Sequence, residues 1–339
     1  MVEVSIGALK DIQVTPLAAE SLGVRSMCTF VQTDDVAILL DAGISLCPWR
    51  FSLPPHPLEF QTIHVLREKI AKMADKAQIV TLSHYHYDHH TPFFEDWMVN
   101  WTTQTQTARQ IYQDKILLVK HPKESINKSQ QERALAFLKT CGDYAKTLQE
   151  ADNKTFTYGN TNICFSKAVA HGEDNASLGY VIMTTIEYKN QEKFMFAPDI
   201  QGPMSNHTLQ LILETQPNML MLGGPPFYLA DTRIKKTSIQ NAITNLKAIT
   251  KTIPITIIEH HTLRDELFKQ KLCSLKTYAD QAGHNILTAA EYIGQENNLL
   301  EAQRKSLYQT SPPTEKFQTW QNNLNLFNKN QIIPKPPIF

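Results

Sequence analysis

Residues 83–90 carry a high density of side chains that bind metal ions. The stretch reads Ser-His-Tyr-His-Tyr-Asp-His-His and follows an apolar run. Neutral imidazole and carboxylate are the usual nitrogen and oxygen ligands of zinc and its first-row neighbours. A solvated His-rich turn is the alternative, but such a turn gives no reason for matching ligands downstream. The stretch therefore predicts a metal-binding loop with five candidate ligands: His84, His86, Asp88, His89 and His90.

Such a loop needs further ligands from other strand ends, and three positions follow it along the chain. His171 follows one strand-like run and Asp199 follows another. A third run ends in the pair His260 and His261. Each position alone is weak evidence, because a lone His or Asp at a strand end is more often structural. Together, and in this order, they predict one shared site whose last ligand is left open between the two adjacent histidines.

Strand-like and helix-like segments mix throughout the chain, which predicts an α/β fold. No Gly/Ser linker divides the chain, so one sandwich domain over residues 1–339 is more economical than two domains. We expect an insertion at about 91–150 and a helical extension from about 265. The expected strands cover 12–17, 27–33, 36–40, 77–82, 115–120, 155–158, 161–166, 175–183, 194–197, 218–222 and 254–258. The expected helices cover 59–75, 131–140, 208–216, 232–250, 265–282 and, as one long C-terminal helix, 289–307.

The order His-x-His-x-Asp-His resembles the metal-binding loop of the metallo-β-lactamase superfamily. The resemblance extends from Asp41 to His261 and implies a four-layer αββα sandwich. The sequence Leu-Leu-Asp-Ala-Gly resembles the superfamily's first acidic motif, which implies that Asp41 supports the metal loop by hydrogen bonds. Further stretches resemble an archaeal branch of predicted hydrolases without an assigned substrate: 21–27, 53–57, 83–94, 121–122 with 126–130, and 259–265.

Carried over residue by residue, the resemblance implies two metal positions joined by a bridging carboxylate. The chain departs from the commoner pattern by doubling its histidines at 89–90 and 260–261. Zinc is the leading expectation, and manganese or iron suits the same donors. The first position would take His84, His86 and His171; the second would take Asp88, His89 and one of His260 or His261; Asp199 would bridge them.

A site of this kind implies a metal-dependent hydrolase. Two ions about 3.5–4 Å apart share a hydroxide whose pKa is lowered towards about 7, and this hydroxide attacks a phosphorus or carbonyl centre. Asp88, Asp199 and His90 are the expected catalytic residues. Asp199 would orient the hydroxide, and His90 or the unligated member of the 260–261 pair would protonate the leaving group.

The substrate class is left open. A phosphoester is slightly favoured over a lactone or thioester of a small metabolite, and a non-catalytic metal-binding scaffold is the alternative of another class. An oxidoreductase is disfavoured, because the diiron relatives tend to replace the second histidine of the motif by glutamate and His86 is retained here. Five basic residues could bind the phosphate groups of such a substrate: Lys120, Lys123, Lys128, Arg133 and Arg264. The plainer interpretation is that they form a solvated charged face.

Composition leaves the partners open. The 33 basic residues balance 33 acidic ones, so the net charge gives no argument for binding of nucleic acid or of an anionic membrane. A zero net charge is still compatible with a local basic groove. The five cysteines contain no C-x-x-C pair, which argues against a disulfide scaffold and a cysteine zinc site. No signal peptide is evident, and no apolar run reaches about 20 residues. A cytoplasmic, non-membrane protein of unspecified oligomeric state is expected.

Overall fold

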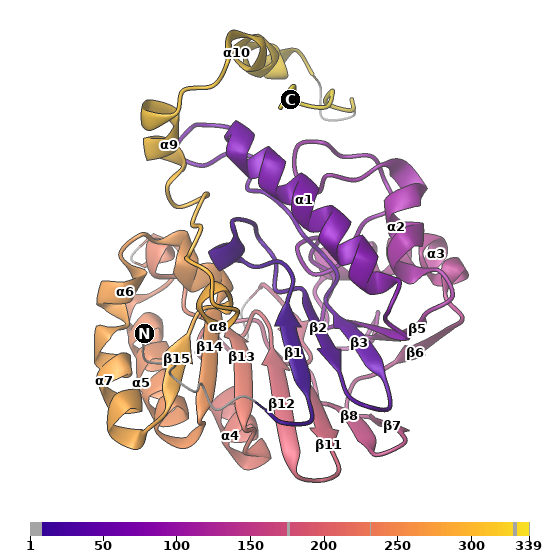
Figure 1. The fold of residues 1–339 in the computed structure, drawn as a ribbon, viewed down its shortest axis with the longest axis vertical. Coiled ribbons are helices and arrows are strands. Elements are labelled where there is room, and N and C mark those ends of the chain that lie inside the picture. The colour runs from indigo at the N-terminus through magenta and orange to yellow at the C-terminus, as the bar shows by residue number, and fades with distance from the viewer. Residues whose placement is uncertain (1–8, 175–176, 231, 328–330, 339) are drawn as a thin grey trace.

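The computed structural model describes residues 9–174, 177–230, 232–327 and 331–338. Two β-sheets lie against each other, and helices cover the outer face of each sheet (Figure 1). This architecture is the four-layer αββα sandwich that the sequence predicts. Within the described residues, no helix is both long enough and apolar enough to cross a membrane.

The first sheet has six strands in the order β1-β2-β3-β4-β5-β6. Its first three strands pair antiparallel, and the strands from β3 to β6 pair parallel. Three helices flank it in Figure 1: α1 (Pro57–Ala74), α2 (Gln104–Tyr112) and α3 (Lys128–Thr140). The strands are β1 (Gln13–Pro16), β2 (Thr29–Gln32), β3 (Ala37–Leu40), β4 (Ile79–Leu82), β5 (Ile116–Val119) and β6 (Thr147–Glu150).

The second sheet has seven strands in the order β15-β14-β13-β12-β11-β8-β7. The strands from β12 to β15 pair parallel, and β9 (Val169–Ala170) forms a separate short pair with β10 (Tyr180–Val181). The outer helices are α4 (Asn206–Thr215), α5 (Lys236–Thr252) and α7 (Cys273–Ala282). The strands are β7 (Thr155–Tyr158), β8 (Thr161–Phe165), β11 (Thr184–Tyr188), β12 (Glu192–Ala197), β13 (Met219–Gly223), β14 (Ile255–Glu259) and β15 (Asn285–Leu287).

Strand β13 shows why the central strands read as continuous apolar runs. Met219 and Met221 lie in the core that includes the first sheet. Leu220 and Leu222 belong to the second core, which contains buried residues of α4, α5 and α7. Successive side chains point to opposite faces of a strand, and both faces of this strand are covered. Burial on both sides therefore removes the polar alternation expected of a half-exposed strand.

The segment 91–150 contributes to the first sheet as well as to its surface. It contains α2 and α3 on the outer side and the paired strands β5 and β6. The sequence does not predict α2, because a Gln/Thr-rich stretch has a low apolar content. That 91–150 is an insertion relative to other proteins of this fold stays a prediction.

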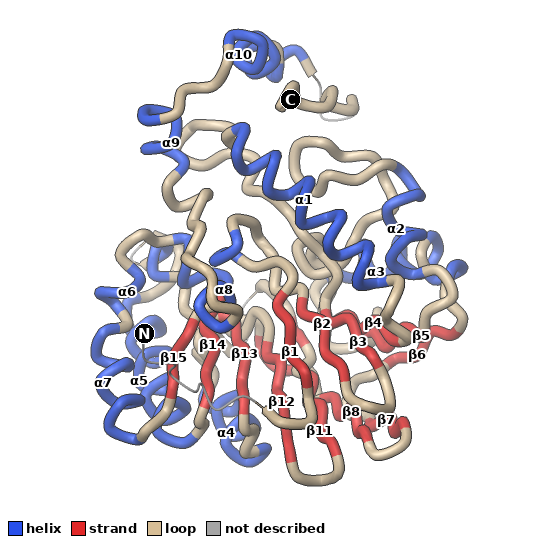
Figure 2. Tube along the Cα trace, in the orientation of Figure 1, coloured by secondary structure: helices blue, strands red, loops and turns tan. Residues whose placement is uncertain are grey.

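Two expected elements are wrong. Of the strand expected at 175–183, only Tyr180–Val181 (β10) is a strand, because the next strand, β11, begins at Thr184; residues 175–176 lie outside the described residues. The long helix expected at 289–307 ends early, because α8 (Ala289–Tyr292) stops before Gly294, whose φ of 72° is left-handed. The chain becomes helical again in α9 (Arg304–Thr310) and α10 (Glu315–Asn322), which lie beyond one end of α1 in Figures 1 and 2. Left-handed glycine is a common helix terminator.

Candidate metal centre

The predicted ligands come from the carboxyl ends of strands in both sheets. Strand β4 leads directly into the loop 83–90, and β9 leads to His171. In the second sheet, Asp199 follows β12, and His260 follows β14. Because neighbouring parallel strands end at the same edge of a sheet, their following residues are brought together there. The fold thus gathers side chains that lie up to 177 positions apart.

The first group of ligands surrounds one oxygen of Asp199. Its Oδ2 lies 2.8 Å from His171 Nε2, 3.2 Å from His84 Nε2 and 3.8 Å from His86 Nδ1. One ligand atom from each of these four residues lies within 4.8 Å of the other three. Three imidazoles and one carboxylate in this arrangement suit a zinc-like cation. The structure therefore brings together the residues predicted for the first metal position.

The second group forms on the other side of Asp199. His260 Nε2 lies 3.0 Å from Asp199 Oδ1 and 3.4 Å from Asp88 Oδ2. Ligand atoms of Asp88, His89 and His260 lie within 4.8 Å of one another. His89 Nε2 also lies 3.4 Å from Asp199 Oδ2. Asp199 consequently contacts both groups, with its two oxygens directed to different histidines.

The backbone at Asp199 is held by a close approach of β13. Asp199 has a left-handed φ of 52°. A Cβ atom on Gly223 would lie 2.6 Å from Asp199 N, closer than such contacts occur. Only glycine lets the two strand ends approach in this way.

Unpaired buried atoms show that the cluster is incomplete without a cation. His89 Nε2, Asp199 Oδ1 and His261 Nε2 are buried and have no hydrogen-bond partner. Buried polar atoms are rarely left unpaired, because desolvation without a partner costs free energy. Three such atoms face the same cluster of carboxylate and imidazole donors, so the residues present fit divalent cations.

The ionisation states of Asp199 and His84 also suit metal binding. Burial by itself would raise the pKa of Asp199, but His260, His89 and His171 outweigh it and hold that pKa well below its usual value. Burial and the neighbouring His89 lower the pKa of His84 well below its usual value. Asp199 therefore carries an ionised carboxylate and the first group offers a neutral imidazole, the forms that bind metals.

Asp41 supports the loop from the end of β3. Its Oδ1 accepts a hydrogen bond from Ser83 N at 2.8 Å, and its Oδ2 lies 2.8 Å from His89 Nδ1. The next residue but one, Gly43, is packed so closely that a Cβ atom there would lie 2.2 Å from His90 N. The hydrogen bonds leave His89 Nε2 directed at the cluster, which is the arrangement that second-shell carboxylates impose on metal-binding histidines.

Glu20 is a supporting residue that sequence reasoning missed. Its Oε2 lies 3.0 Å from His260 Nδ1, and its Oε1 accepts a hydrogen bond from Arg264 Nε at 2.5 Å. Burial pushes the pKa of Glu20 up, but Arg264 and His260 outweigh it and lower that pKa. Glu20 stands in a polar link near the N-terminus, and no local pattern connects it with a histidine 240 positions away.

The adjacent histidines at 260 and 261 differ in position. His260 belongs to the group of Asp88 and His89, whereas His261 forms a possible ligand group only with Asp199 and His260, with Nε2 3.4 Å from Asp199 Oδ1. His261 Nδ1 lies 3.0 Å from Arg264 Nη1. Burial and Arg264 lower the pKa of His261 to about 3. The geometry thus favours His260 as the ligand and leaves His261 as a neutral imidazole beside Asp199.

His90 is not brought to the cluster. Its Nδ1 donates to the His86 carbonyl at 2.9 Å, and its ring lies 5.0 Å from that of Tyr87 and 5.7 Å from that of Phe137. Burial lowers the pKa of His90 to about 3. His90 belongs to none of the groups of possible ligands in the cluster. Its expected catalytic role stays a prediction, which its place among aromatic rings does not favour.

The basic residues expected to meet phosphates have different surroundings. Lys120 is buried and pairs with Asp152 at 2.6 Å, so the expectation for Lys120 is wrong. Arg133 lies over the ring of Tyr87 at 4.9 Å, on the loop that carries the ligands. Lys123 and Lys128 are exposed, as a solvated charged face would be. Arg264 alone among the five contacts ligand side chains.

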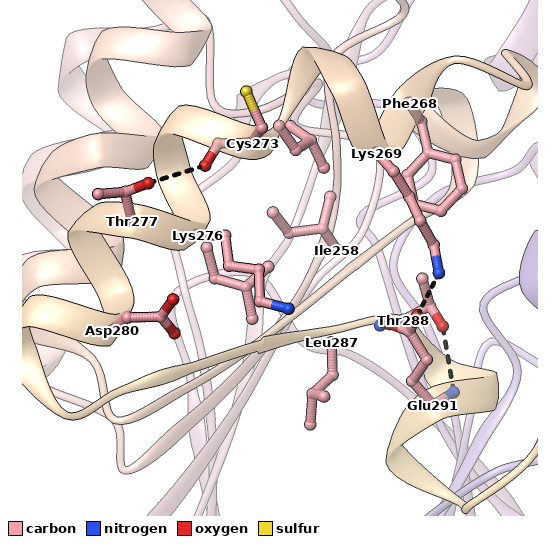
Figure 3. A pocket seen from close by; sticks show the side chains of 12 residues that line it. Ile258, Phe268, Lys269, Cys273, Lys276, Thr277, Asp280, Leu287, Thr288 and Glu291 are labelled. Carbon is pink, nitrogen blue, oxygen red and sulfur yellow. Dashed lines mark hydrogen bonds and ion pairs between the residues drawn. The ribbon is translucent and has the colours of Figure 1, made fainter.

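A separate cavity of about 330 Å³ lies away from this chemistry (Figure 3). It is lined by residues of α6 (Phe268–Lys271), α7, β15 and α8. Lys269 pairs with Glu291 at its rim, at 3.0 Å. None of the eight predicted ligands lines the cavity.

Solved structures of low sequence identity resemble the chain only distantly. A diphosphatase from the PhnP family is 12% identical, with a TM-score of 0.45 over 74% of this chain and 86% of that one. A long-form RNase Z from yeast is 14% identical, with a TM-score of 0.43 over 76% of this chain and 38% of that one. The four layers and the His-x-His-x-Asp-His loop, rather than these scores, identify the fold as metallo-β-lactamase-like.

Comparison with curated sequences is more informative. No family model matches the chain. A UPF0282 protein of Methanocaldococcus jannaschii is 43% identical over 307 residues, which are 90% of this chain and all of that protein. A UPF0282 protein of Methanopyrus kandleri is 39% identical over 87% of this chain and 99% of that protein. The chain therefore belongs to the UPF0282 family.

Proposed function

We propose that this protein is a hydrolase that uses two divalent metal ions. The observation that carries the proposal is the position of Asp199 between two groups of ligands, with Oδ2 near His84 and His171 and Oδ1 near His260. A carboxylate shared in this way suits a pair of ions. Zinc is our leading candidate because the donors are mainly imidazoles, and manganese or iron suits the same set.

The ligands are assigned by the two groups. The first ion would be held by His84, His86 and His171, and the second by Asp88, His89 and His260. Asp199 would serve both. When bound, such ions lower the pKa of water towards about 7 and polarise a substrate oxygen.

The chain's own residues would then orient the reactants. Asp41 and Glu20 hold His89 and His260 with Nε2 directed inward. His261 presents an unpaired Nε2 3.4 Å from Asp199 Oδ1, where it would hold a proton of the attacking water or of the leaving group. We assign the proton-carrying role to His261 in preference to His90, because His261 and not His90 belongs to a group of possible ligands around Asp199.

A phosphoester is the substrate class we favour. Arg264 and Arg133 lie beside the ligand-bearing loops, and guanidinium groups suit phosphate oxygens. A lactone or thioester hydrolase is the second candidate, because the same site would polarise a carbonyl oxygen. We place the protein in the cytoplasm, in keeping with its five free cysteines.

Metal analysis and a substrate panel test the proposal together. The purified protein should contain up to two metal ions per chain by mass spectrometry and should cleave one class among chromogenic phosphodiesters, phosphomonoesters, lactones and thioesters. His84→Ala and Asp88→Ala should lose metal and turnover. His207→Ala is the matched control, because His207 is exposed on α4. Full turnover by a metal-free variant would refute the mechanism, and metal binding without any turnover would favour the scaffold alternative.

A further inference from the structure

The loop 47–53 carries two aromatic side chains into solvent. Trp49 is 53% exposed and Phe51 is 49% exposed. Among the residues that the structure describes, no other tryptophan, phenylalanine or tyrosine is exposed. Large aromatic rings usually contribute to the core, and exposed rings are enriched where proteins bind other molecules. The pair is therefore a candidate contact surface.

The backbone of this loop is held in a costly conformation. Arg50 and Leu53 exchange both backbone hydrogen bonds, at 3.0 and 2.9 Å, which closes a two-residue turn. The two residues inside the turn, Phe51 and Ser52, have left-handed φ values of 55° and 61°. Such turns favour Asn and Gly, and a bulky residue at positive φ is unusual. A phenylalanine that is strained and also exposed indicates a use for the ring itself.

A buried arginine fixes both ends of the loop. Arg304 Nη2 donates to Cys47 O at 2.8 Å, and Arg304 Nη1 donates to Leu53 O at 3.0 Å. The same guanidinium binds both carboxylate oxygens of Glu59, each at 2.8 Å. Arg304 and Glu59 are fully buried. The loop is thus held in place without a ligand, so its rings lose little conformational freedom when a ligand binds.

Arg50 connects the loop to the segment that follows β14. Its guanidinium lies over the ring of Phe51 at 4.8 Å and over that of Tyr228 at 4.6 Å, and its Nη2 donates to Arg264 O at 3.1 Å. Arg264 Nη1 donates to Tyr228 Oη at 3.2 Å, and Arg264 Nη2 lies 3.2 Å from His260 Nε2. A continuous series of contacts therefore leads from the exposed rings to the candidate metal centre.

We propose that Trp49 and Phe51 form a platform on which the planar base of a nucleotide-like phosphoester stacks, while the phosphate of the same molecule reaches the metal centre. The inference rests on the hydrolase proposed above and names its substrate class. Aromatic side chains bind the flat faces of bases by stacking, with little dependence on which base is present.

The groups between the platform and the metal centre suit a charged molecule with a spacer. The guanidinium groups of Arg50 and Arg264 favour an anionic phosphate on this side of the site. Because Arg50, Tyr228 and Arg264 lie between the platform and His260, the ring and the phosphate must be held apart, as the sugar of a nucleotide holds them. A ring bonded directly to the phosphate does not reach both places.

A pair of ligands with and without a base tests the platform. AMP and ribose 5-phosphate share a sugar phosphate and differ in the adenine ring. Their affinities for the zinc-loaded full chain are measured by calorimetry, and chromatography shows whether each ligand stays intact. Where a ligand is hydrolysed, kcat/KM takes the place of affinity. We expect the adenine to strengthen binding at least about fivefold, the scale of one stacked base.

Trp49→Leu should reduce this preference for AMP at least about threefold, because the stacking surface is lost. The affinity for ribose 5-phosphate should stay within about twofold of the wild type, because the sugar phosphate does not contact the platform. Phe51→Leu is a second test on the same loop. Val65→Ala is the matched control, because it shortens an exposed apolar side chain on α1, and its preference should equal the wild type. Thermal melting shows whether each variant is folded.

Phenyl phosphate tests the spacing. Its ring is bonded to the phosphate oxygen, so its affinity should not change in Trp49→Leu. Sedimentation of the wild type and of Trp49→Leu tests the other occupant of an exposed aromatic surface, a second copy of this chain.

The outcomes separate the platform from the proposed hydrolase. Equal binding of AMP and ribose 5-phosphate, or a preference unchanged in folded Trp49→Leu and Phe51→Leu, overturns the platform and leaves the hydrolase standing. An equal loss of phenyl phosphate and AMP binding in Trp49→Leu overturns the spacing. A dimer that Trp49→Leu converts to a monomer assigns the rings to a second copy and overturns the platform. A preference for AMP in a chain that hydrolyses no phosphoester overturns the hydrolase and retains the platform.

Discussion

The carboxylate of Asp41 holds the imidazole of His89, with Oδ2 2.8 Å from Nδ1. The same carboxylate binds Ser83 N at 2.8 Å. One residue at the end of β3 therefore fixes both the start of the ligand loop and the direction of a ligand ring. This relationship crosses two adjacent parallel strands and depends on their register.

Replacing this carboxylate should weaken metal binding. We expect Asp41→Asn to lower affinity about 10–100-fold, since second-shell carboxylates contribute on that scale. Equilibrium dialysis with zinc measures the effect. Asp34→Asn is the control, because Asp34 lies on the turn of the same hairpin and contacts Tyr188 instead of a ligand. Wild-type affinity in Asp41→Asn would contradict the supporting role.

A methyl group at Gly43 should displace the ligand loop. The Cβ of Gly43→Ala would lie 2.2 Å from His90 N and 2.4 Å from His89 N, and neither backbone atom can move without moving the loop. We expect a loss of about 1–3 kcal/mol of unfolding free energy, together with reduced metal content. Gly142→Ala serves as the control, because its nearest neighbours would lie at 3.5 and 4.0 Å. Full metal content in Gly43→Ala would show that the loop tolerates the shift.

His90 should affect stability rather than metal binding. His90→Gln loses the hydrogen bond to the His86 carbonyl and the ring contact with Phe137, so we expect a cost of about 1–3 kcal/mol. Metal per chain should stay at the wild-type value, and kcat should change by less than about threefold. Denaturant unfolding and metal analysis measure the two effects. A hundredfold fall in kcat at full metal content would restore the proton-donor role.

The buried pair of Arg25 and Glu301 should make stability depend on acid. Burial would raise the pKa of Glu301, but Arg25, 2.6 Å away, outweighs it and holds that pKa far below its usual value. The folded pKa is below the unfolded one, about 4.3, so the pair stabilises the fold above that pH and loses its contribution as pH falls.

Glu301→Gln tests this dependence. We expect about 1–3 kcal/mol less stability at pH 7, because the part-buried Arg25 loses its charged partner. The loss of stability between pH 6 and pH 3 should be smaller in the variant than in the wild type, as measured by urea unfolding across that range. Glu266→Gln is the control, because Glu266 is exposed. Its stability should follow the wild-type curve over the same pH range. Parallel curves for Glu301→Gln and wild type would exclude the pair as the acid-sensitive group.

The sequence by itself determined the kinds of ligand and their order along the chain. Residues 83–90 follow a run that is buried on both sides, and Asp199 and His260 follow other such runs. Apolar continuity is a local signal of a central strand, and ligand type is a property of the side chain. For these reasons an α/β fold and a set of candidate ligands could be predicted from the chain, whereas the four-layer sandwich and the grouping of the ligands were expected from the family resemblance.

Only the tertiary structure decided which of the adjacent histidines His89 and His90 faces the cluster. His89 and His90 are adjacent, but one contacts Asp41 and Asp199 while the other packs among aromatic rings. Glu20 reaches His260 across 240 positions, and Arg264 contacts the same histidine with its guanidinium. Side-chain direction in a loop depends on backbone angles, and contacts between distant segments depend on sheet register. Neither is encoded in residue type or spacing.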